Sequence, residues 1–497
     1  MNFYIKTTPL EKVDEDLLVL FSFQDTVYEL ASLIKPLSNI ILEGAKKEKF
    51  TGKENESLTL YTQPKIASYK LLILGLGKKE KFNLYKLRKN VAVAINKSMQ
   101  LKAVKVGIKP PDEWFKTFDG GTIGQAIVEG AALGGYKFDK YKSDSGKKKD
   151  EGVSDVSILS MPNKVSLLEQ GVKKGKIFSE ATIYARDLIN EPPTYTTPSF
   201  LAEKAREIAN SSGGAIKVSI YEKEEIEKMG LEAFLGVSRG SDEPPKFIVL
   251  SYKKNRSKRK IAIVGKGITF DTGGLSLKGP EHMETMKLDM SGAAAVLGIF
   301  KALSSINPDS EVLGIIAACE NMPSGKALKP GDILRASNGK TIEVLNTDAE
   351  GRLTFADALS FAVKQKPDGI IDLATLTGAC MVALGGEIAG LWGNDGKLSE
   401  KIKKAAELTG EKIWSMPLEE EYKDLIKSHI ADVKNIQTGR YGGAITAALF
   451  LEEFVGTVPW VHLDIAGPAY AESDTPIVPK GGAGFGVRTV LQFLLDF

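Results

Sequence analysis

The chain has little cysteine and little histidine. Its 497 residues include only two cysteines, Cys319 and Cys380, and three histidines. Both cysteines lie within runs of apolar or small residues, so we expect small buried side chains in a reducing compartment. We therefore expect no framework of disulfides. Three histidines are also too few for a histidine-rich metal site.

The chain has no excess of charge of one sign either. Lysine and arginine number 66 and aspartate and glutamate 63, for a net charge of +3. This balance gives no electrostatic support for a nucleic acid partner. The N-terminal stretch MNFYIKTTPLEKVDEDLL lacks the apolar segment of a signal peptide, and no uninterrupted apolar run is long enough to cross a bilayer. We therefore expect a cytoplasmic protein with no membrane partner.

The length exceeds what one ordinary hydrophobic core organises, so two domains are expected. Residues 1–165 alternate short β-rich runs with helical patterns and predict a smaller N-terminal α/β domain. Residues 166–190 carry apolar residues at helical spacing up to the prolines of NEPPTYTTP, and predict a connecting helix. Residues 191–497 form the second domain. The polar run SDSGKKKDEG at 143–152 predicts a solvated loop.

The second domain repeats a pattern of strand, loop and helix. Several of its strand candidates are continuous apolar runs, as in strands that are buried on both faces. The candidates lie at 246–252, 260–266, 311–319, 341–346, 369–375 and 460–467. Helical patterns lie between most of them. The fold class predicted is therefore α/β, with a mostly parallel sheet sandwiched by helices.

Polar, reactive side chains gather where these strands end, which is where open α/β sheets form their sites. The group comprises four acids and three bases: Asp271, Asp289, Asp348, Glu350, Lys266, Lys278 and Arg352. In the stretch NTDAEGRL (346–353), an extended chain would place positions 348, 350 and 352 on one face. Four carboxylates brought together repel one another, and divalent cations compensate them best. The pattern therefore indicates a two-metal site.

Lys266 is the unusual member of this group. It binds metal only as a neutral amine, and deprotonating it near pH 7 costs roughly 4–5 kcal/mol. A nearby dication and burial would offset that cost. A salt bridge from Lys266 to an acid is the alternative, and spacing alone favours it.

Several motifs together resemble the leucyl aminopeptidases (cytosol aminopeptidases) of peptidase family M17. The most specific are NTDAEGRL, VGKGITFDTGG (264–274) and MKLDMSGAAA (286–295). The likeness extends to NEPPTYTTPSFLAEKA, DLATLTGA, WVHLDIAGPAY and GAGFGVRT, and covers most of the C-terminal half. It implies that residues 191–497 form a catalytic metallopeptidase domain.

The resemblance also implies the roles of the clustered residues. One divalent metal ion would be held by Lys266, Asp271, Asp289 and Glu350, and a more exchangeable one by Asp271, Asp348 and Glu350. Manganese or zinc is implied, with cobalt and magnesium as alternatives. Lys278 would polarise the scissile carbonyl. Arg352 would anchor a bicarbonate ion that acts as general base on the attacking water.

A substrate pocket and an assembly are implied in the same way. The substrate would be a peptide with a free N-terminus, and its amine would ligate one metal. Small or apolar residues would receive a leucine-like first side chain: Met286, Thr375, Leu376, Thr377, Ala466 and Ala469. The family assembles as a homohexamer. The alternative function is that of a DNA-binding regulatory protein on the same scaffold, and a further reading is another metal-dependent amidohydrolase.

Overall fold

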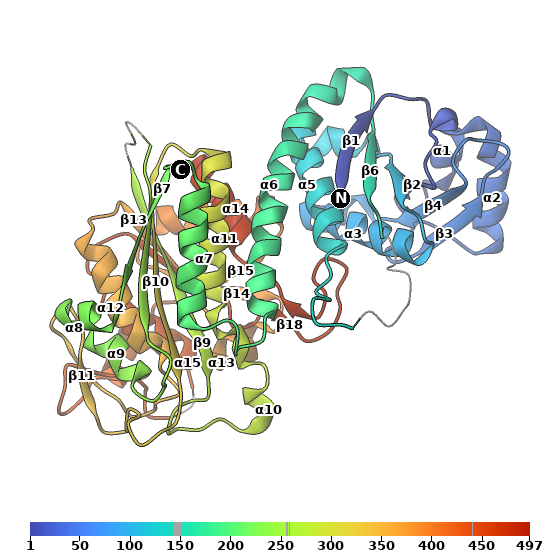
Figure 1. Ribbon diagram of the computed structural model, residues 1–497. Helices are drawn as coiled ribbons and strands as arrows, with labels where there is room; N and C mark the ends of the chain where they lie inside the picture. The colour runs from blue at the N-terminus through green and yellow to red at the C-terminus, as the bar shows by residue number, and fades with distance from the viewer. Residues whose placement is uncertain (144–151, 255–256, 258, 440) are drawn as a thin grey trace. The chain divides into compact units, whose positions relative to one another are not determined.

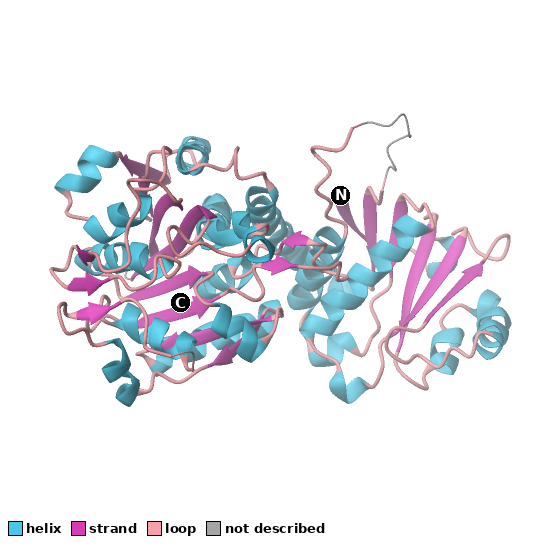
Figure 2. Ribbon diagram, turned by 90° about the horizontal axis from the view of Figure 1, so that it is seen from below, coloured by secondary structure: helices cyan, strands magenta, loops and turns pink. Residues whose placement is uncertain are grey.

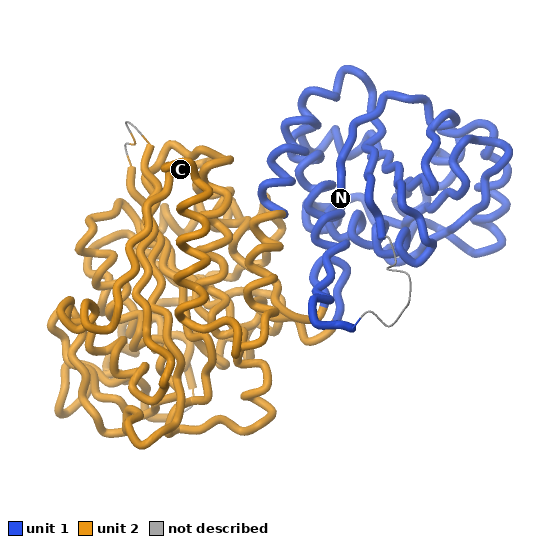
Figure 3. Tube along the Cα trace, in the orientation of Figure 1, with its two compact units in different colours: residues 1–179, 474–479 blue, residues 180–473, 480–497 orange. Residues whose placement is uncertain are grey.

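The computed structural model describes residues 1–143, 152–254, 257, 259–439 and 441–497 (Figure 1). The predicted loop at 143–152 lies, apart from its two end residues, outside the described residues. The chain divides into two compact units (Figure 3). Unit 1 comprises Met1–Ser179 and Asp474–Pro479, and unit 2 comprises Glu180–Ser473 and Lys480–Phe497.

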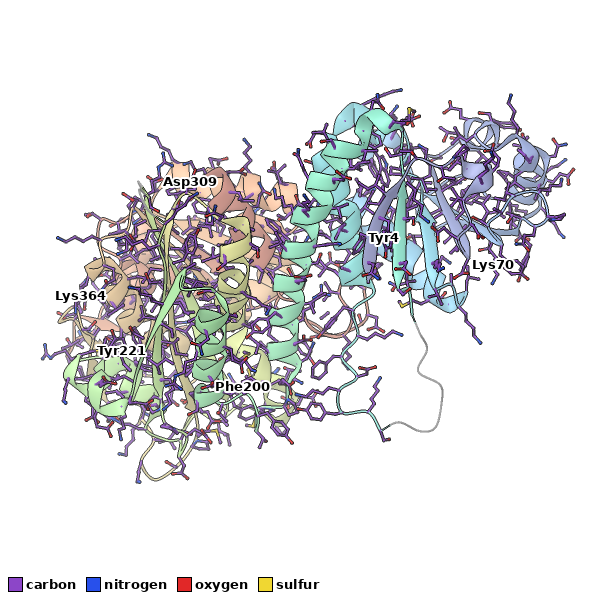
Figure 4. The ribbon with its side chains drawn as sticks, turned by 45° about the horizontal axis from the view of Figure 1, so that its top comes forward. Tyr4, Lys70, Phe200, Tyr221, Asp309 and Lys364 are labelled. Atoms are coloured by element: carbon purple, nitrogen blue, oxygen red, sulfur yellow. The ribbon has the colours of Figure 1, made fainter. Side chains whose placement is uncertain are left out.

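Unit 1 is built on a six-stranded sheet in the order β1-β6-β5-β2-β4-β3. All neighbours are parallel except β3 and β4, which pair antiparallel at one edge. The strands are β1 Asn2–Lys6, β2 Leu17–Ser22, β3 Ser57–Tyr61, β4 Lys70–Gly75, β5 Lys105–Ile108 and β6 Asp155–Leu159. Every residue of β2 is buried, as expected of a central strand covered on both faces. In Figure 4, Tyr4 marks β1 and Lys70 marks the start of β4.

The helices of unit 1 begin at recognisable caps. The side chains of Asn83 and Asp119 accept hydrogen bonds from backbone N–H groups in the first turns of α3 and α5. The helices are α1 Val27–Ser32, α2 Ser38–Lys47, α3 Leu84–Gln100, α4 Trp114–Thr117, α5 Gly120–Gly134 and α6 Val165–Asn190, the last of which continues into unit 2. Short 3-10 turns lie at Leu10–Lys12, Lys35–Leu37, Lys79–Lys81 and Pro162–Lys164.

Unit 2 contains an eight-stranded sheet in the order β15-β14-β17-β13-β9-β10-β8-β7. Its four central strands, β17, β13, β9 and β10, run parallel, and antiparallel pairs flank them. The strands are β7 Ile216–Tyr221, β8 Lys246–Tyr252, β9 Lys260–Asp271, β10 Glu311–Asn321, β13 Gly369–Ala374, β14 Ile388–Gly393, β15 Lys412–Ser415 and β17 Trp460–Asp464. The predicted α/β class is confirmed, with the parallel arrangement at the centre of a mixed sheet.

Helices cover both faces of this sheet (Figures 1 and 2). One layer holds α7 Pro198–Ser211, α11 Ser291–Ile306, α14 Gly396–Thr409 and α16 Val487–Asp496, and the other holds α9 Glu232–Ser238, α12 Gly351–Lys364 and α15 Gly443–Glu452. The remaining helices are α8 Lys223–Lys228, α10 Pro280–Met283 and α13 Gly378–Leu384, with 3-10 turns η5 Met286–Met290 and η6 Glu420–Ile426. The stretch Pro280–Ile306 has the length and composition of a membrane span, but 78% of its most apolar window is buried, as in a core helix.

One predicted strand is placed differently. The run at 341–346 was expected in the main sheet, but only Thr341–Glu343 is a strand, β12. It belongs to a separate three-stranded sheet with β11 Ile333–Arg335 and β16 Val433–Lys434. The physical reason is its burial pattern, since a three-residue strand with one fully buried side chain cannot serve as a central strand covered on both faces. A two-stranded ribbon, β18 Tyr470–Ala471 with β19 Gly481–Gly482, completes the unit.

Candidate active site

Strand β9 brings the first two polar residues to the site. The sequence predicted that this strand would end at residue 266, but it continues to Asp271, so Lys266 and Asp271 both lie on it. Both side chains are buried although they are charged. Two glycines let neighbouring segments pack tightly against Lys266. A Cβ atom at Gly292 would lie 2.6 Å from Lys266 N, and one at Gly351 would lie 2.6 Å from Lys266 Cε. Two helices therefore begin in direct contact with Lys266.

The stretch NTDAEGRL is a turn followed by a helix, so the expectation of an extended chain was wrong. Asp348 N donates a hydrogen bond to Asn346 Oδ1 (2.8 Å), which folds the backbone into a turn. Glu350 has helical dihedral angles and is the N-cap residue of α12, and Arg352 lies in the first turn of that helix. Asp348 and Glu350 still share the site, because the turn aims both carboxylates at it and not because strand positions alternate.

The acids surround two lysine ammonium groups. Lys266 Nζ lies 2.8 Å from Asp289 Oδ2 and 2.8 Å from Glu350 Oε1. Lys278 Nζ lies 2.8 Å from Asp271 Oδ2 and forms a close ion pair with Asp348. All of the predicted acids are therefore brought together, although they come from β9, η5 and the loop before α12.

Further hydrogen bonds fix the orientation of these carboxylates. Asp271 Oδ1 accepts from Asn321 Nδ2 (2.8 Å) and from Gly273 N (2.9 Å). Asp289 Oδ1 accepts from Thr375 Oγ1 (2.7 Å), and Lys266 Nζ donates to the carbonyl oxygen of Thr375 (2.9 Å). Asn321, at the end of β10, was not predicted from the sequence, because an amide at the end of an apolar run has no spacing that distinguishes it.

Burial and mutual repulsion control the charges of the acids. Burial, together with the negative charges of Asp271 and Asp289, raises the pKa of Glu350 to about 8. Burial raises the pKa of Asp289 and Asp348 as well. Burial by itself would lower the pKa of Lys266, but the surrounding carboxylates outweigh it and the pKa is raised. The cluster is thus short of positive charge, and its lysines stay protonated.

The donor set fits divalent metal ions. Oxygen atoms of Asp271, Asp348 and Glu350 lie within 4.8 Å of one another. Neither carboxylate oxygen of Glu350 has a hydrogen-bond partner among the described residues, and Oε1 meets Lys266 only as an ion pair. Buried carboxylate oxygens without donors are costly unless a cation compensates them. Oxygen-rich sets of this kind suit hard or borderline ions.

Arg352 lies beside the cluster and not in the wall of the cavity. Its Nη1 donates to the backbone oxygen of Asn435 (2.5 Å), while its buried Nε has no hydrogen-bond partner among the described residues. Burial lowers the pKa of Arg352 to about 10, against the opposing influence of Glu350 and Asp464. The guanidinium therefore remains charged at neutral pH, and the N–H group at its Nε is not used by the described residues.

The cluster forms the floor of a cavity of about 810 Å³ in unit 2. Five of the six residues predicted to contact substrate line it: Met286, Thr375, Leu376, Thr377 and Ala466. Ala469 does not, because its side chain is fully buried beneath the surface of the cavity. Lys278 lines it too. Exposed side chains at the rim include Leu277 and His282. His462, by contrast, lies on β17 and is buried against Asp372, so it is a core residue and does not line the cavity.

Two family models match most of the chain. A model of the cytosol aminopeptidase family catalytic domain matches residues 183–491, and one of that family's N-terminal domain matches residues 19–145. The chain belongs to the cytosol aminopeptidase family. Probable cytosol aminopeptidases from Persephonella marina (strain DSM 14350 / EX-H1) and Aquifex aeolicus (strain VF5) are similar to it. The first is 44% identical over 502 residues (100% of each chain), and the second is 47% identical over 481 residues (96% of this chain and 95% of the relative).

Two solved structures show the same fold. A mutant of tomato leucine aminopeptidase superposes with a TM-score of 0.89 and 36% identity, covering 100% of this chain and 97% of the other. The bottromycin maturation enzyme BotP in complex with Mn superposes with a TM-score of 0.84 and 32% identity, covering 97% and 99%. As a member of this family, the protein is an aminopeptidase with an N-terminal and a catalytic domain.

Proposed function

We propose that the protein is a dinuclear metal-dependent aminopeptidase that releases leucine-like N-terminal residues from peptides. The observation that carries the proposal is the buried Glu350 carboxylate, whose Oε2 has no partner among the described residues and whose Oε1 meets only the Lys266 ammonium. One ion would be held by Lys266, Asp271, Asp289 and Glu350, and the other by Asp271, Asp348 and Glu350. The Mn complex of the related BotP supports manganese, and zinc remains the alternative.

Divalent ions supply Lewis-acid chemistry, which makes water a nucleophile at neutral pH. The role of Lys266 as a ligand requires its neutral amine, and the pKa of Lys266 is raised while only carboxylates surround it. Lys266 would therefore have to release its proton in order to hold a metal ion. The two short ion pairs of Lys266 support this, since they place its nitrogen at the centre of the ligand set.

Lys278 acts on the substrate carbonyl. Its side chain is 13% exposed, and it reaches the cavity between Asp271 and Asp348. Burial would lower the pKa of Lys278, but Asp271 and Glu350 raise it more strongly, so the ammonium stays charged. A fixed ammonium at this position stabilises the negative charge that develops on the carbonyl oxygen.

Arg352 binds a small anion. Its free Nε lies next to Nη2, and two parallel N–H donors suit a planar oxyanion such as bicarbonate. Bicarbonate supplies a general base when it is bound. Arg352 itself holds its place through Asn435 and keeps its positive charge beside Glu350.

The cavity selects the first residue of the peptide. Its wall combines Met286, Leu376 and Ala466 with the hydroxyl groups of Thr375 and Thr377. An apolar wall beside a metal-binding floor would accept an uncharged side chain and a neutral terminal amine together. This supports a preference for leucine-like first residues with a free N-terminus.

We also propose a homohexamer acting in the cytoplasm, with domains at 1–165 and 191–497 joined by the helix 166–190. The name of the relatives supports the compartment. Large apolar side chains exposed in unit 2 support assembly: Val382 is 90%, Tyr441 80% and Trp414 63% exposed. Sedimentation of the purified protein tests the hexamer.

The deciding experiment is hydrolysis of leucine amide by chelated protein resupplied with manganese or zinc, beside N-acetyl-leucine amide. Metal-dependent release from the free amine alone is expected. Cleavage of both substrates would indicate a general amidase. Cleavage of neither, with each metal bound at two per chain by elemental analysis, would contradict the proposal and lead to DNA-binding assays.

A further inference from the structure

A buried row of polar side chains lies directly behind the wall of the cavity. Strands β13 and β17 pair in parallel, with Asp372 opposite His462 and Ala374 opposite Asp464. His462 and Asp464 are two positions apart on β17 and point to the same face. Asp464 is completely buried and does not line the cavity.

Asp464 binds three groups that belong to the wall. Its Oδ1 accepts hydrogen bonds from Leu376 N (3.2 Å) and from Ala466 N (3.1 Å). Its Oδ2 accepts from Thr377 Oγ1 (2.7 Å). Leu376, Thr377 and Ala466 all line the cavity. A single carboxylate therefore joins the two loops that follow β13 and β17.

Thr377 extends this connection to a helix. Its Oγ1 also accepts from Cys380 N (3.1 Å), which caps the N-terminus of α13. Met381 of α13 lines the cavity. The Thr377 hydroxyl has one proton and donates it to Asp464, so its oxygen is left to accept from Cys380 N. The Asp464 carboxylate therefore fixes the orientation of the hydroxyl in both of these hydrogen bonds.

The other end of the same segment is attached to the acidic cluster. Thr375 accepts from Lys266 Nζ through its backbone oxygen and donates to Asp289 through its hydroxyl. The segment 375–377 is thus fixed at one end by the cluster and at the other by Asp464.

We propose that Asp464 is a positioning residue that sets the shape of the wall against the acidic floor and so determines selectivity for the first side chain. This proposal rests on the proposed function, because selectivity for the first side chain is measured through the hydrolysis of substrates. Asparagine at 464 keeps an acceptor for the two N–H groups, but its NH₂ group cannot accept the proton of the Thr377 hydroxyl. Alanine removes all three bonds.

The test compares leucine and alanine p-nitroanilides. Asp464→Ala should lower kcat/KM for leucine about tenfold more than for alanine, with a rise in KM, because the displaced wall no longer fits the larger side chain. Asp464→Asn should give an intermediate change. Thr377→Val should shift the leucine-to-alanine ratio in the same direction, and Thr377→Ser should restore it. Asp372→Asn is the matched control, since this buried acid binds Trp460 and His462 behind the wall.

A lower fraction of folded enzyme reduces kcat for both substrates equally and leaves their ratio unchanged. An unchanged ratio in Asp464→Ala and in Thr377→Val would therefore overturn the proposal. Amide hydrogen exchange supplies a readout without catalysis: peptides covering residues 374–380 should exchange faster in Asp464→Ala than in Asp372→Asn. If the wild type were inactive, the proposed function would fail, and equal exchange in these two variants would separately reject the role of Asp464.

Discussion

Lys266 Nζ lies 2.8 Å from Glu350 Oε1, yet neither oxygen of Glu350 has a hydrogen-bond partner among the described residues. This pair stands at the centre of the acidic cluster. Replacing Glu350 with glutamine should leave a ligand set that binds less metal, because the carboxamide is neutral. We expect metal content below two ions per chain and loss of nearly all hydrolysis. Elemental analysis of dialysed protein measures the metal content, and an assay with leucine amide measures the hydrolysis. Full metal content in Glu350→Gln would contradict the assignment.

Lys278 contacts two of the acids and the cavity. Lys278→Gln should lower kcat by about 10²–10³-fold, as removal of an oxyanion donor does. KM should change little, since the contribution of Lys278 grows as charge develops on the carbonyl oxygen. Lys287→Gln serves as the control, because the Lys287 ammonium donates to the backbone oxygen of Asn190. Steady-state kinetics separate the two effects, and a loss confined to KM would place Lys278 in ground-state binding.

Arg352 should make the enzyme responsive to bicarbonate. In bicarbonate-free buffer the wild type should be slow, and added bicarbonate should accelerate it. Arg352→Ala should be slow at every concentration, because the free Nε and the positive charge are both removed. Arg352→Lys, which keeps the charge but loses the paired donors, should respond only at higher concentration. If bicarbonate did not change the rate of the wild-type enzyme, Arg352 would not have the proposed role of binding it.

Asp357 should impose a pH dependence on the stability of unit 2. The buried carboxyl accepts from Phe234 N (2.9 Å) and Ser337 N (2.7 Å), and burial raises its pKa to about 7. Between the unfolded pKa near 4 and the folded pKa near 7, the folded state holds the extra proton. Stability therefore decreases as pH rises through this window, by up to roughly 4 kcal/mol.

Asp357→Asn should lack this part of the pH dependence. The asparagine oxygen keeps one of the two N–H bonds, so the variant should be less stable than the wild type at pH 4.5. The difference should shrink towards pH 7.5, where the wild type carries the cost of a buried charge. Urea unfolding of both proteins at several pH values gives the difference. A constant difference would show that Asp357 has the same pKa in both states.

Long regular elements could be predicted from the sequence. The strand at 246–252 has the predicted bounds, and the helix Ser291–Ile306 lies between two predicted strands, where a helical pattern was expected. A continuous apolar run and a 3.6-residue period are local properties of the sequence. The prediction of a long strand at 341–346 was wrong, because a three-residue strand followed by a turn has the same apolar content as a longer strand. Propensity decides little in so short a segment.

The acidic cluster could be predicted as a set, but not its geometry. Its motifs are local and specific, whereas the turn at Asn346 depends on side-chain hydrogen bonds that no periodicity reveals. Asn321 and Asp464 were not predicted because each ends an apolar strand and acts across the sheet. The return of Asp474–Pro479 to unit 1 is likewise a long-range feature without a local pattern.

The contact between Gly351 and Lys266 restricts how this enzyme can be redesigned. A methyl group at 351 would come within 2.8 Å of the lysine nitrogen and push it from its acids. Even the smallest addition there is therefore incompatible with the active arrangement. The exposed rim is different, since Leu277 and His282 face solvent and can change without disturbing the packing below. Variant libraries designed for new peptide substrates should therefore change the rim residues and keep the stretch NTDAEGRL (346–353) unchanged.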